Sequence, residues 1–234
     1  RWALAEQSFK RALELAPNDA ELQHQYADWL SAVGRSEEAL AAANKAVALD
    51  PLVPIFLNGQ GNMLMRLGRV DEAIEVRQAA YALAPELRTV TQNLMYSYLV
   101  AGRLDEAEAM LDQIRSSALA EANRDPTWGA TEAEQRVGRA LIRVLRDPAQ
   151  REAVREALHD QEYAWLLFGL SQLGSTPEDI DQQFKRIEEE LDKHVNGVDP
   201  IVMLRSARYA DYRKDPRYIR LLNMAGFDDA GNFR

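Results

Sequence analysis

Apolar residues recur along the first half of the chain at the three- and four-residue spacing of an amphipathic helix. Between residues 20 and 33 they are Leu22, Tyr26, Trp29, Leu30 and Val33. Such a stripe marks the face that a helix buries. Gly34 follows directly and suits the left-handed backbone conformation that often ends a helix. The pattern therefore predicts a helix over residues 20–33 and a tight turn after it.

A second helix is predicted directly after this turn. We expect Ser36 to be its N-cap, with Glu37 and Glu38 in the first turn, where the helix dipole favours acidic side chains. Small residues then form one face, which would let the two helices approach closely: Ala39, Ala43 and Ala46. The helix should stop at Asp50, because Pro51 disfavours helical geometry in the residue before it. One unit is thus helix, turn, helix and proline stop.

The unit returns at a constant interval of 34 residues. The stretches GRSEEAL, GRVDEAI and GRLDEAE begin at Gly34, Gly68 and Gly102. The other columns in phase are Ala5, Ala39, Ala73 and Ala107; Ala12, Ala46 and Ala80; and Pro17, Pro51 and Pro85. A fixed period of this size is the signature of a repeat array. The clean array covers residues 1–117 and starts in the second helix of a truncated unit, from which we expect a piece of a longer protein.

These columns resemble the tetratricopeptide repeat (TPR) family, together with the small residues Ala27 and Gly61. The resemblance implies an all-α fold, an α-α superhelix or TPR solenoid, in which the first helix of each unit lines a concave groove. It also implies a protein–protein interaction role. Three positions depart from the family pattern: Gln60 replaces a leucine, Met95 a small residue and Leu119 a proline.

The second half of the chain loses the clean period. Residues 118–130 are expected to form a connection, and helical patterns resume over 131–146 and 149–160, with a buried side at Val137, Leu141, Val144 and Leu145. An apolar helix is predicted over 162–174. An amphipathic helix follows it, with Ile180, Phe184, Ile187 and Leu191 on its apolar side. We therefore expect residues 131–234 to be divergent TPR-like helices that end in a cap.

The stretch YADYRKDPRYIRLLNMAGF near the end of the chain carries a second resemblance. It is similar to the ending LRxDPRFxxLLxxxG of TPR regions in bacterial class III adenylate cyclases and winged-helix transcriptional regulators. The matching residues are Arg213, Asp215, Pro216, Arg217, Tyr218, Leu221, Leu222 and Gly226. Asp215 should cap a short helix with Pro216 in its first turn, and Tyr218, Ile219 and Leu222 should dock on the last repeat. Such a cap would hide the apolar end of an array.

This second resemblance implies that the segment is part of a larger bacterial signalling or regulatory protein. Such repeat regions commonly follow a membrane segment, which favours a periplasmic over a cytoplasmic location. The sequence itself leaves both locations open. It contains no run of about 18 apolar residues that could cross a bilayer.

Composition and chemistry narrow the function classes. A net charge of −9 argues against a nucleic-acid partner, whose phosphates would be repelled. The absence of cysteine excludes disulfides, zinc–thiolate sites and thiol catalysis. His24, His159 and His194 lie in unrelated segments without partners at metal-ligand spacing, and no phosphate-binding glycine loop occurs. We therefore predict that the protein is not an enzyme and uses no cofactor or metal.

The candidate site is an amide-rich groove on the first helices of the repeats. The 34-residue step aligns one row of His24, Asn58 and Gln92, a second of Asp28, Asn62 and Tyr96, and a third of Gln25, Gly59 and Asn93. Amides can both donate to and accept from an extended peptide backbone. Gly59 would let a ligand approach the helix closely. The alternative is a merely solvated face, with Gly61 present for close helix packing.

The charges of this groove favour a neutral or basic ligand. Arg66, with Arg88 beside it, supplies the basic groups, while Glu21 and Asp28 are acidic. A clamp for a peptide carboxylate would need more cations. We predict that Asn58, Asn62 and Asn93 contact a bound peptide.

Two other functions remain open from the sequence. One is a self-associating scaffold or assembly factor for an envelope or secretion complex. The other is the substrate-selecting arm of a TPR-bearing transferase.

Overall fold

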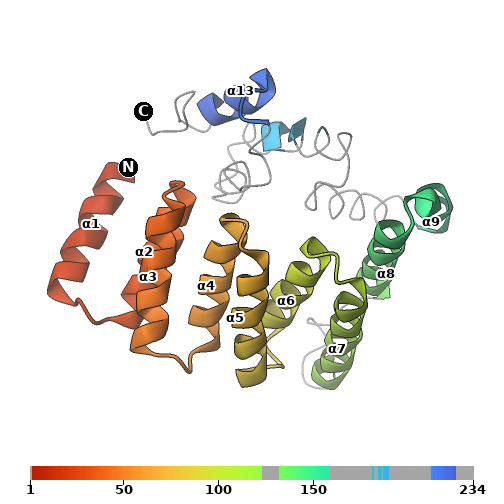
Figure 1. Cartoon of the computed structure of the whole chain (residues 1–234), viewed down its shortest axis with the longest axis horizontal. Coiled ribbons are helices and arrows are strands. Elements are labelled where there is room, and N and C mark those ends of the chain that lie inside the picture. The colour runs from red at the N-terminus through yellow and green to blue at the C-terminus, as the bar shows by residue number, and fades with distance from the viewer. Residues whose placement is uncertain are drawn as a thin grey trace. The chain divides into compact units, whose positions relative to one another are not determined.

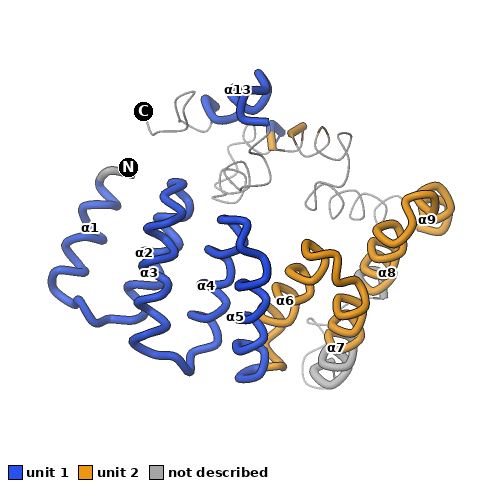
Figure 2. Tube along the Cα trace, viewed as in Figure 1, with its two compact units in different colours: residues 1–84, 188–234 blue, residues 85–187 orange. Residues whose placement is uncertain are grey.

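The computed structural model describes residues 2–122, 132–158, 181, 184–185, 187–189 and 212–224, and every regular element among them is a helix (Figure 1). The chain divides into two compact units, residues 1–84 with 188–234 and residues 85–187 (Figure 2). The first unit contains α1 (Trp2–Leu15), α2 (Ala20–Ala32), α3 (Ser36–Leu49), α4 (Pro54–Arg66), α5 (Val70–Leu83) and α13 (Pro216–Met224). The second contains α6 (Arg88–Val100), α7 (Leu104–Ala122), α8 (Glu132–Arg146), the 3₁₀ turn η1 (Pro148–Gln150) and α9 (Arg151–Ala157).

Glycine turns close the helix pairs that the repeat pattern predicts. Helix α2 packs on α3 and α4 on α5 in the first unit, and α6 packs on α7 in the second. Gly34, Gly68 and Gly102 have φ of 79°, 75° and 71°, a left-handed conformation that a side chain would strain. The residue after each glycine donates its N–H back to the helix, as Arg35 does to the Leu30 carbonyl at 2.9 Å. The predicted helix–turn–helix unit is confirmed.

The start of the second helix differs from the expectation in one respect. Ser36 is already the first residue of α3, so Arg35 holds the N-cap position and no side chain caps the helix. The turn leaves a single residue between Gly34 and the helix, and that residue is the arginine of each GR stretch. Its guanidinium bonds the glutamate three residues on, with Nε–O distances of 2.6 Å (Arg35–Glu38), 2.7 Å (Arg69–Glu72) and 2.8 Å (Arg103–Glu106). These arginine bonds lower the pKa of all three glutamates.

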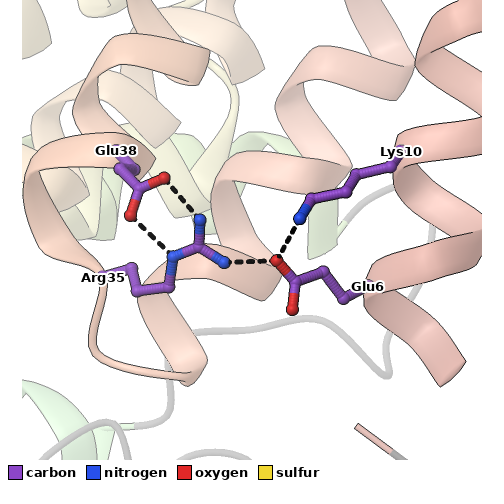
Figure 3. A network of polar contacts seen from close by, with 4 residues as sticks. All are labelled: Glu6, Lys10, Arg35 and Glu38. Atoms are coloured by element: carbon purple, nitrogen blue, oxygen red, sulfur yellow. Dashed lines mark hydrogen bonds and ion pairs between the residues drawn. The ribbon is translucent and has the colours of Figure 1, made fainter. Parts of the chain in front are cut away.

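The first of these arginines also reaches α1 (Figure 3). Arg35 donates to Glu6 at 2.6 Å, and Lys10 approaches the same Glu6 oxygen at 2.8 Å. The hydrogen bond from Lys10, followed by that from Arg35, lowers the pKa of Glu6. The later units lack this link because Leu40 and Ile74 occupy the positions that correspond to Glu6. The network therefore links α1 to the α2–α3 helix pair that follows it.

Small residues occupy the predicted contact face of the second helices. Ala39, Ala43 and Ala46 of α3 are buried, as are the equivalent Ala73 and Ala80 of α5. Ala39, Ala43 and Ala73 pack in one cluster with larger side chains, including Leu30 and Met63. Because an alanine methyl group is short, the helix backbones can lie close together.

In the second unit, α7 continues to Ala122, so the first five residues of the expected connection at 118–130 are helical. The long helix packs against α8, where Arg139 pairs with Asp112 at 2.7 Å. Helix α8 and the following η1–α9 segment confirm the predicted helices, although η1 replaces the first turn of the second. Their core joins Ala140, Val144 and Val154 with partly buried apolar neighbours: Val137, Leu141, Leu145 and Leu158.

The terminal helix α13 begins at Pro216, as predicted. The Asp215 carboxylate accepts the backbone N–H of Arg217 at 2.8 Å and pairs with its guanidinium, which lowers the pKa of Asp215. Tyr218 and Leu222 are buried, whereas Ile219 is only half-buried. Phe184 and Ile187 are buried and helical. The predicted helix over 162–174, His159 and His194 lie outside the described residues.

Candidate binding surface on α2 and α4

Helices α2 and α4 lie against each other in the first unit and carry most of the predicted site. His24 and Asp28 are one turn apart on α2, and Asn58, Asn62 and Arg66 follow one another turn by turn along one side of α4. We call these five residues the α2–α4 surface. The structure thus brings five of the eight predicted site residues to two neighbouring helices of one unit.

The space at Gly59 is filled by His24. A Cβ at position 59 would lie 2.6 Å from His24 Cε1, closer than side chains approach. The imidazole also packs on Phe56, with ring centroids 5.3 Å apart. The expectation that Gly59 admits a ligand is therefore wrong, because the histidine of the neighbouring helix occupies that space. His24 has a packing role, and its Nε2 lies 3.8 Å from an Asp28 carboxylate oxygen.

Gly61 makes room for an arginine that the sequence analysis did not single out. Arg77 of α5 is only 2% exposed, and a Cβ at position 61 would lie 2.8 Å from its Cγ. The Arg77 guanidinium donates to the side-chain oxygen of Asn62. Gly61 therefore has a packing role, as the alternative interpretation expected, but what it accommodates is the Arg77 side chain.

The depth of the two α4 asparagines differs. Asn58 is only 4% exposed, so it lies in the interior between helices. Asn62 is half-buried, and its side-chain oxygen accepts a hydrogen bond from Arg77. This bond fixes the orientation of the amide, so its N–H groups point away from Arg77. Of the two, Asn62 is the one that a ligand could contact directly.

The charged groups of the α2–α4 surface influence one another. Desolvation by the neighbouring helices raises the pKa of Asp28, although 57% of its side chain remains exposed; the charges of His24 and Arg66 lower this pKa, and that of Glu21 raises it further. The aspartate is therefore an acid whose charged form the fold disfavours. A cationic ligand group placed beside it would relieve that cost.

Replacing Asp28 by asparagine is expected to raise the melting temperature at pH 7 by about 1–2 °C. Because the folded state raises the pKa of Asp28, the protein is more stable at low pH, where this acid is neutral. That stability is lost as the pH rises through the folded-state pKa and Asp28 becomes charged. The Asp28→Asn advantage should therefore disappear near pH 3, where both proteins carry a neutral side chain. Thermal unfolding followed by circular dichroism at the two pH values tests this. An equal rise at both values would contradict it.

The three remaining site residues lie on α6 in the second unit. Gln92, Asn93 and Tyr96 are half-buried. The amide oxygen of Gln92, in the orientation that satisfies both groups, accepts from Arg88 Nε at 2.8 Å. The backbone carbonyl of Asn93 accepts a hydrogen bond from the Ser97 hydroxyl at 3.0 Å. Their contact with a bound peptide stays a prediction.

Two family models, both described as tetratricopeptide repeat, match residues 27–87 and 64–124. This part of the chain is built of tetratricopeptide repeats. Its TPR units are the α2–α3, α4–α5 and α6–α7 pairs. None of the curated proteins matches the chain.

Solved structures confirm the all-α TPR fold. PilW, described as a widely conserved type IV pilus biogenesis factor, is 19% identical, with 76% of this chain and 73% of PilW covered at a TM-score of 0.52. PilF of Pseudomonas aeruginosa is 20% identical, with 91% and 89% covered at a TM-score of 0.52. At these identities the likeness extends to the fold alone. None of the described helices is long and apolar enough to cross a membrane.

Proposed function

We propose that this protein is a TPR interaction module that binds an extended segment of a partner protein on the α2–α4 surface. The observation that supports this most is the side-by-side packing of α2 and α4, which gathers His24, Asp28, Asn62 and Arg66 on adjacent helices. Asn62 offers amide N–H groups in a fixed orientation, which suits a backbone carbonyl. Asn93 and Tyr96 on α6 are separate candidate contacts within the second unit.

The charge of the surface favours a neutral or basic ligand. Asp28 and Glu21 are exposed and acidic, while the positive charge of Arg66 on α4 attracts Asp28. A lysine or arginine of the ligand would find a carboxylate whose charge is not fully compensated. An acidic segment would meet repulsion from the same two acids.

The end of the chain supports a wider role in a larger bacterial signalling or regulatory protein. Arg213, Asp215 and Pro216 belong to the ending that resembles TPR regions of cyclases and winged-helix regulators, and the Asp215-capped helix fits that motif. In such a protein the module would select a partner, and the periplasm is the favoured location. A substrate-selecting arm of a transferase would use the same surface.

A second candidate is a self-associating scaffold or assembly factor for an envelope or secretion complex. The likeness to PilW, whose description is that of a pilus biogenesis factor, favours this candidate. It predicts a homo-oligomer that forms without another protein. Sedimentation equilibrium at increasing concentration distinguishes the two, because the interaction module alone should remain monomeric.

The experiment that tests the proposed function compares Asp28→Ala/Asn62→Ala with the wild type. Each protein serves as bait in a source-cell lysate, and overlapping peptides from any captured protein are then titrated against both. We expect the double variant to bind the recognised peptide at least about tenfold more weakly. Asn44→Ala, on an exposed position of α3, is the matched control and should bind like the wild type. Equal binding by all three proteins would place the site elsewhere.

A further inference from the structure

Leucines end the second helices of the first unit and remain exposed. Leu15, Leu49 and Leu83 are the last residues of α1, α3 and α5 and follow one another at the repeat interval. Equivalent positions of stacked repeats lie on the same side of an array. In Figure 1 these helix ends lie along the lower edge of the first unit, where the α1–α2 and α3–α4 connections run. This edge lies at the ends of the helices, whereas the α2–α4 surface runs along their sides.

Two more exposed apolar side chains follow Leu49 in the chain, one in the α3–α4 connection and one in the first turn of α4. Leu52 is 72% exposed, about as much as Leu15 at 70%, and Ile55 in the first turn of α4 is also exposed. We call the set the apolar edge: Leu15, Leu49, Leu52, Ile55 and Leu83. Of the seven large apolar side chains that are exposed among the described residues, five belong to it. This concentration makes the edge a candidate interaction surface, since unrelated exposed apolar side chains would be spread over all faces.

The apolar edge is flanked by negative charge. Asp19 and Asp50 lie in the α1–α2 and α3–α4 connections, and Glu14 lies in the last turn of α1, where it pairs with Arg11 at 2.8 Å. The last turns of α1, α3 and α5 contain no basic residue, although a base there would offset the negative end of the helix dipole. One exposed basic residue, Lys45, lies one turn before Leu49 on α3.

We propose that the apolar edge docks a positively charged amphipathic segment of a partner protein. The leucines would take the apolar face of that segment, and its lysines or arginines would meet the flanking acids and the three helix ends. A second copy of this chain is the less suitable occupant, because its edge would bring the same acids face to face. The inference goes beyond the proposed function, since it gives the module a second contact separate from the α2–α4 surface.

The test uses two labelled synthetic peptides and four protein variants. One peptide is an amphipathic helix of leucine and lysine, and the other has glutamate in place of every lysine. The edge variant is Leu15→Ser/Leu49→Ser/Leu52→Ser, with the single Leu52→Ser change as a milder version. Leu4→Ser is the matched control, because Leu4 is similarly exposed but lies toward the opposite end of α1. Asp28→Ala/Asn62→Ala removes the α2–α4 surface instead. Fluorescence anisotropy measures binding, and circular dichroism checks folding.

We expect the leucine–lysine peptide to bind the wild type and Leu4→Ser alike, and the edge variant at least about tenfold more weakly. Leu52→Ser alone should weaken it severalfold. Asp28→Ala/Asn62→Ala should leave this binding unchanged, so that failure of the proposed function and failure of this inference are distinguishable. Equal binding to the edge variant would overturn the inference, as would equal or tighter binding of the leucine–glutamate peptide. If the wild type formed a dimer and the edge variant were monomeric, the inference would also be overturned, because the occupant of the edge would then be a second copy of this chain.

Discussion

Replacing Leu30 by alanine is expected to lower the free energy of unfolding by about 3 kcal/mol, within a range of about 2–5 kcal/mol. Leu30 of α2 is only 1% exposed and packs in the cluster that joins α2, α3 and α4. Its neighbours there include Ala39 and Ala43, whose methyl groups are too short to fill the cavity that the substitution leaves. Because repeat units stabilise one another through their interfaces, the loss should extend beyond a single helix.

The matched control is Leu4→Ala on α1, where the leucine is 67% exposed. That change should alter the free energy of unfolding by no more than about 0.5 kcal/mol. Urea denaturation followed by circular dichroism gives both values. A loss below about 1 kcal/mol for Leu30→Ala would show that the cluster is loosely packed, contrary to the structure.

The repeat interval predicts the backbone of the array well because it depends on local rules. A positive φ at Gly34, a small side chain at Ala39 and a proline after Asp50 each fix one feature of a unit, and all three recur. The wrong N-cap at Ser36 has a local cause too. The glycine turn is one residue shorter than the assumed cap geometry requires, which leaves the position to Arg35.

For the candidate site, the sequence predicts which residues align on neighbouring helices but not which of their side chains are buried. The 34-residue step correctly placed His24 and Asn58 on neighbouring helices, since register follows from periodicity. Which side chain lies inside depends on the space that neighbouring residues leave. Gly59 admits the His24 ring, and Asn58 is buried, yet neither fact follows from spacing alone.

A comparison of equivalent repeat positions in the sequence already indicates that Arg77 is buried. Position 61 corresponds to Ala27 one repeat earlier, and position 77 corresponds to Ala43. Two alanines are therefore replaced by Gly61 and Arg77, the smallest residue and one of the largest. The paired change in size predicts that the arginine fills space beside the glycine, which the structure contains.

Replacing Gly61 by alanine is expected to destabilise the protein by about 1–3 kcal/mol, although alanine favours a helix by about 1 kcal/mol over glycine. The added Cβ would lie 2.8 Å from Arg77 Cγ and 2.9 Å from its Nε, and the arginine, only 2% exposed, has little free space to move into. Displacing the arginine would also disturb its bond to Asn62. Urea denaturation of the single variant measures the cost.

The destabilisation by Gly61→Ala is expected to disappear when Arg77 is also replaced by alanine. The double variant Gly61→Ala/Arg77→Ala recreates the combination of Ala27 and Ala43 from the preceding repeat, where both residues are buried in one cluster. In the Arg77→Ala background the Gly61→Ala change should therefore be neutral or stabilising by up to about 1 kcal/mol. A double-mutant cycle gives the coupling between the two positions. If Gly61→Ala cost the same with and without the arginine, the helix backbones themselves, rather than the Arg77 side chain, would be what requires glycine at this position.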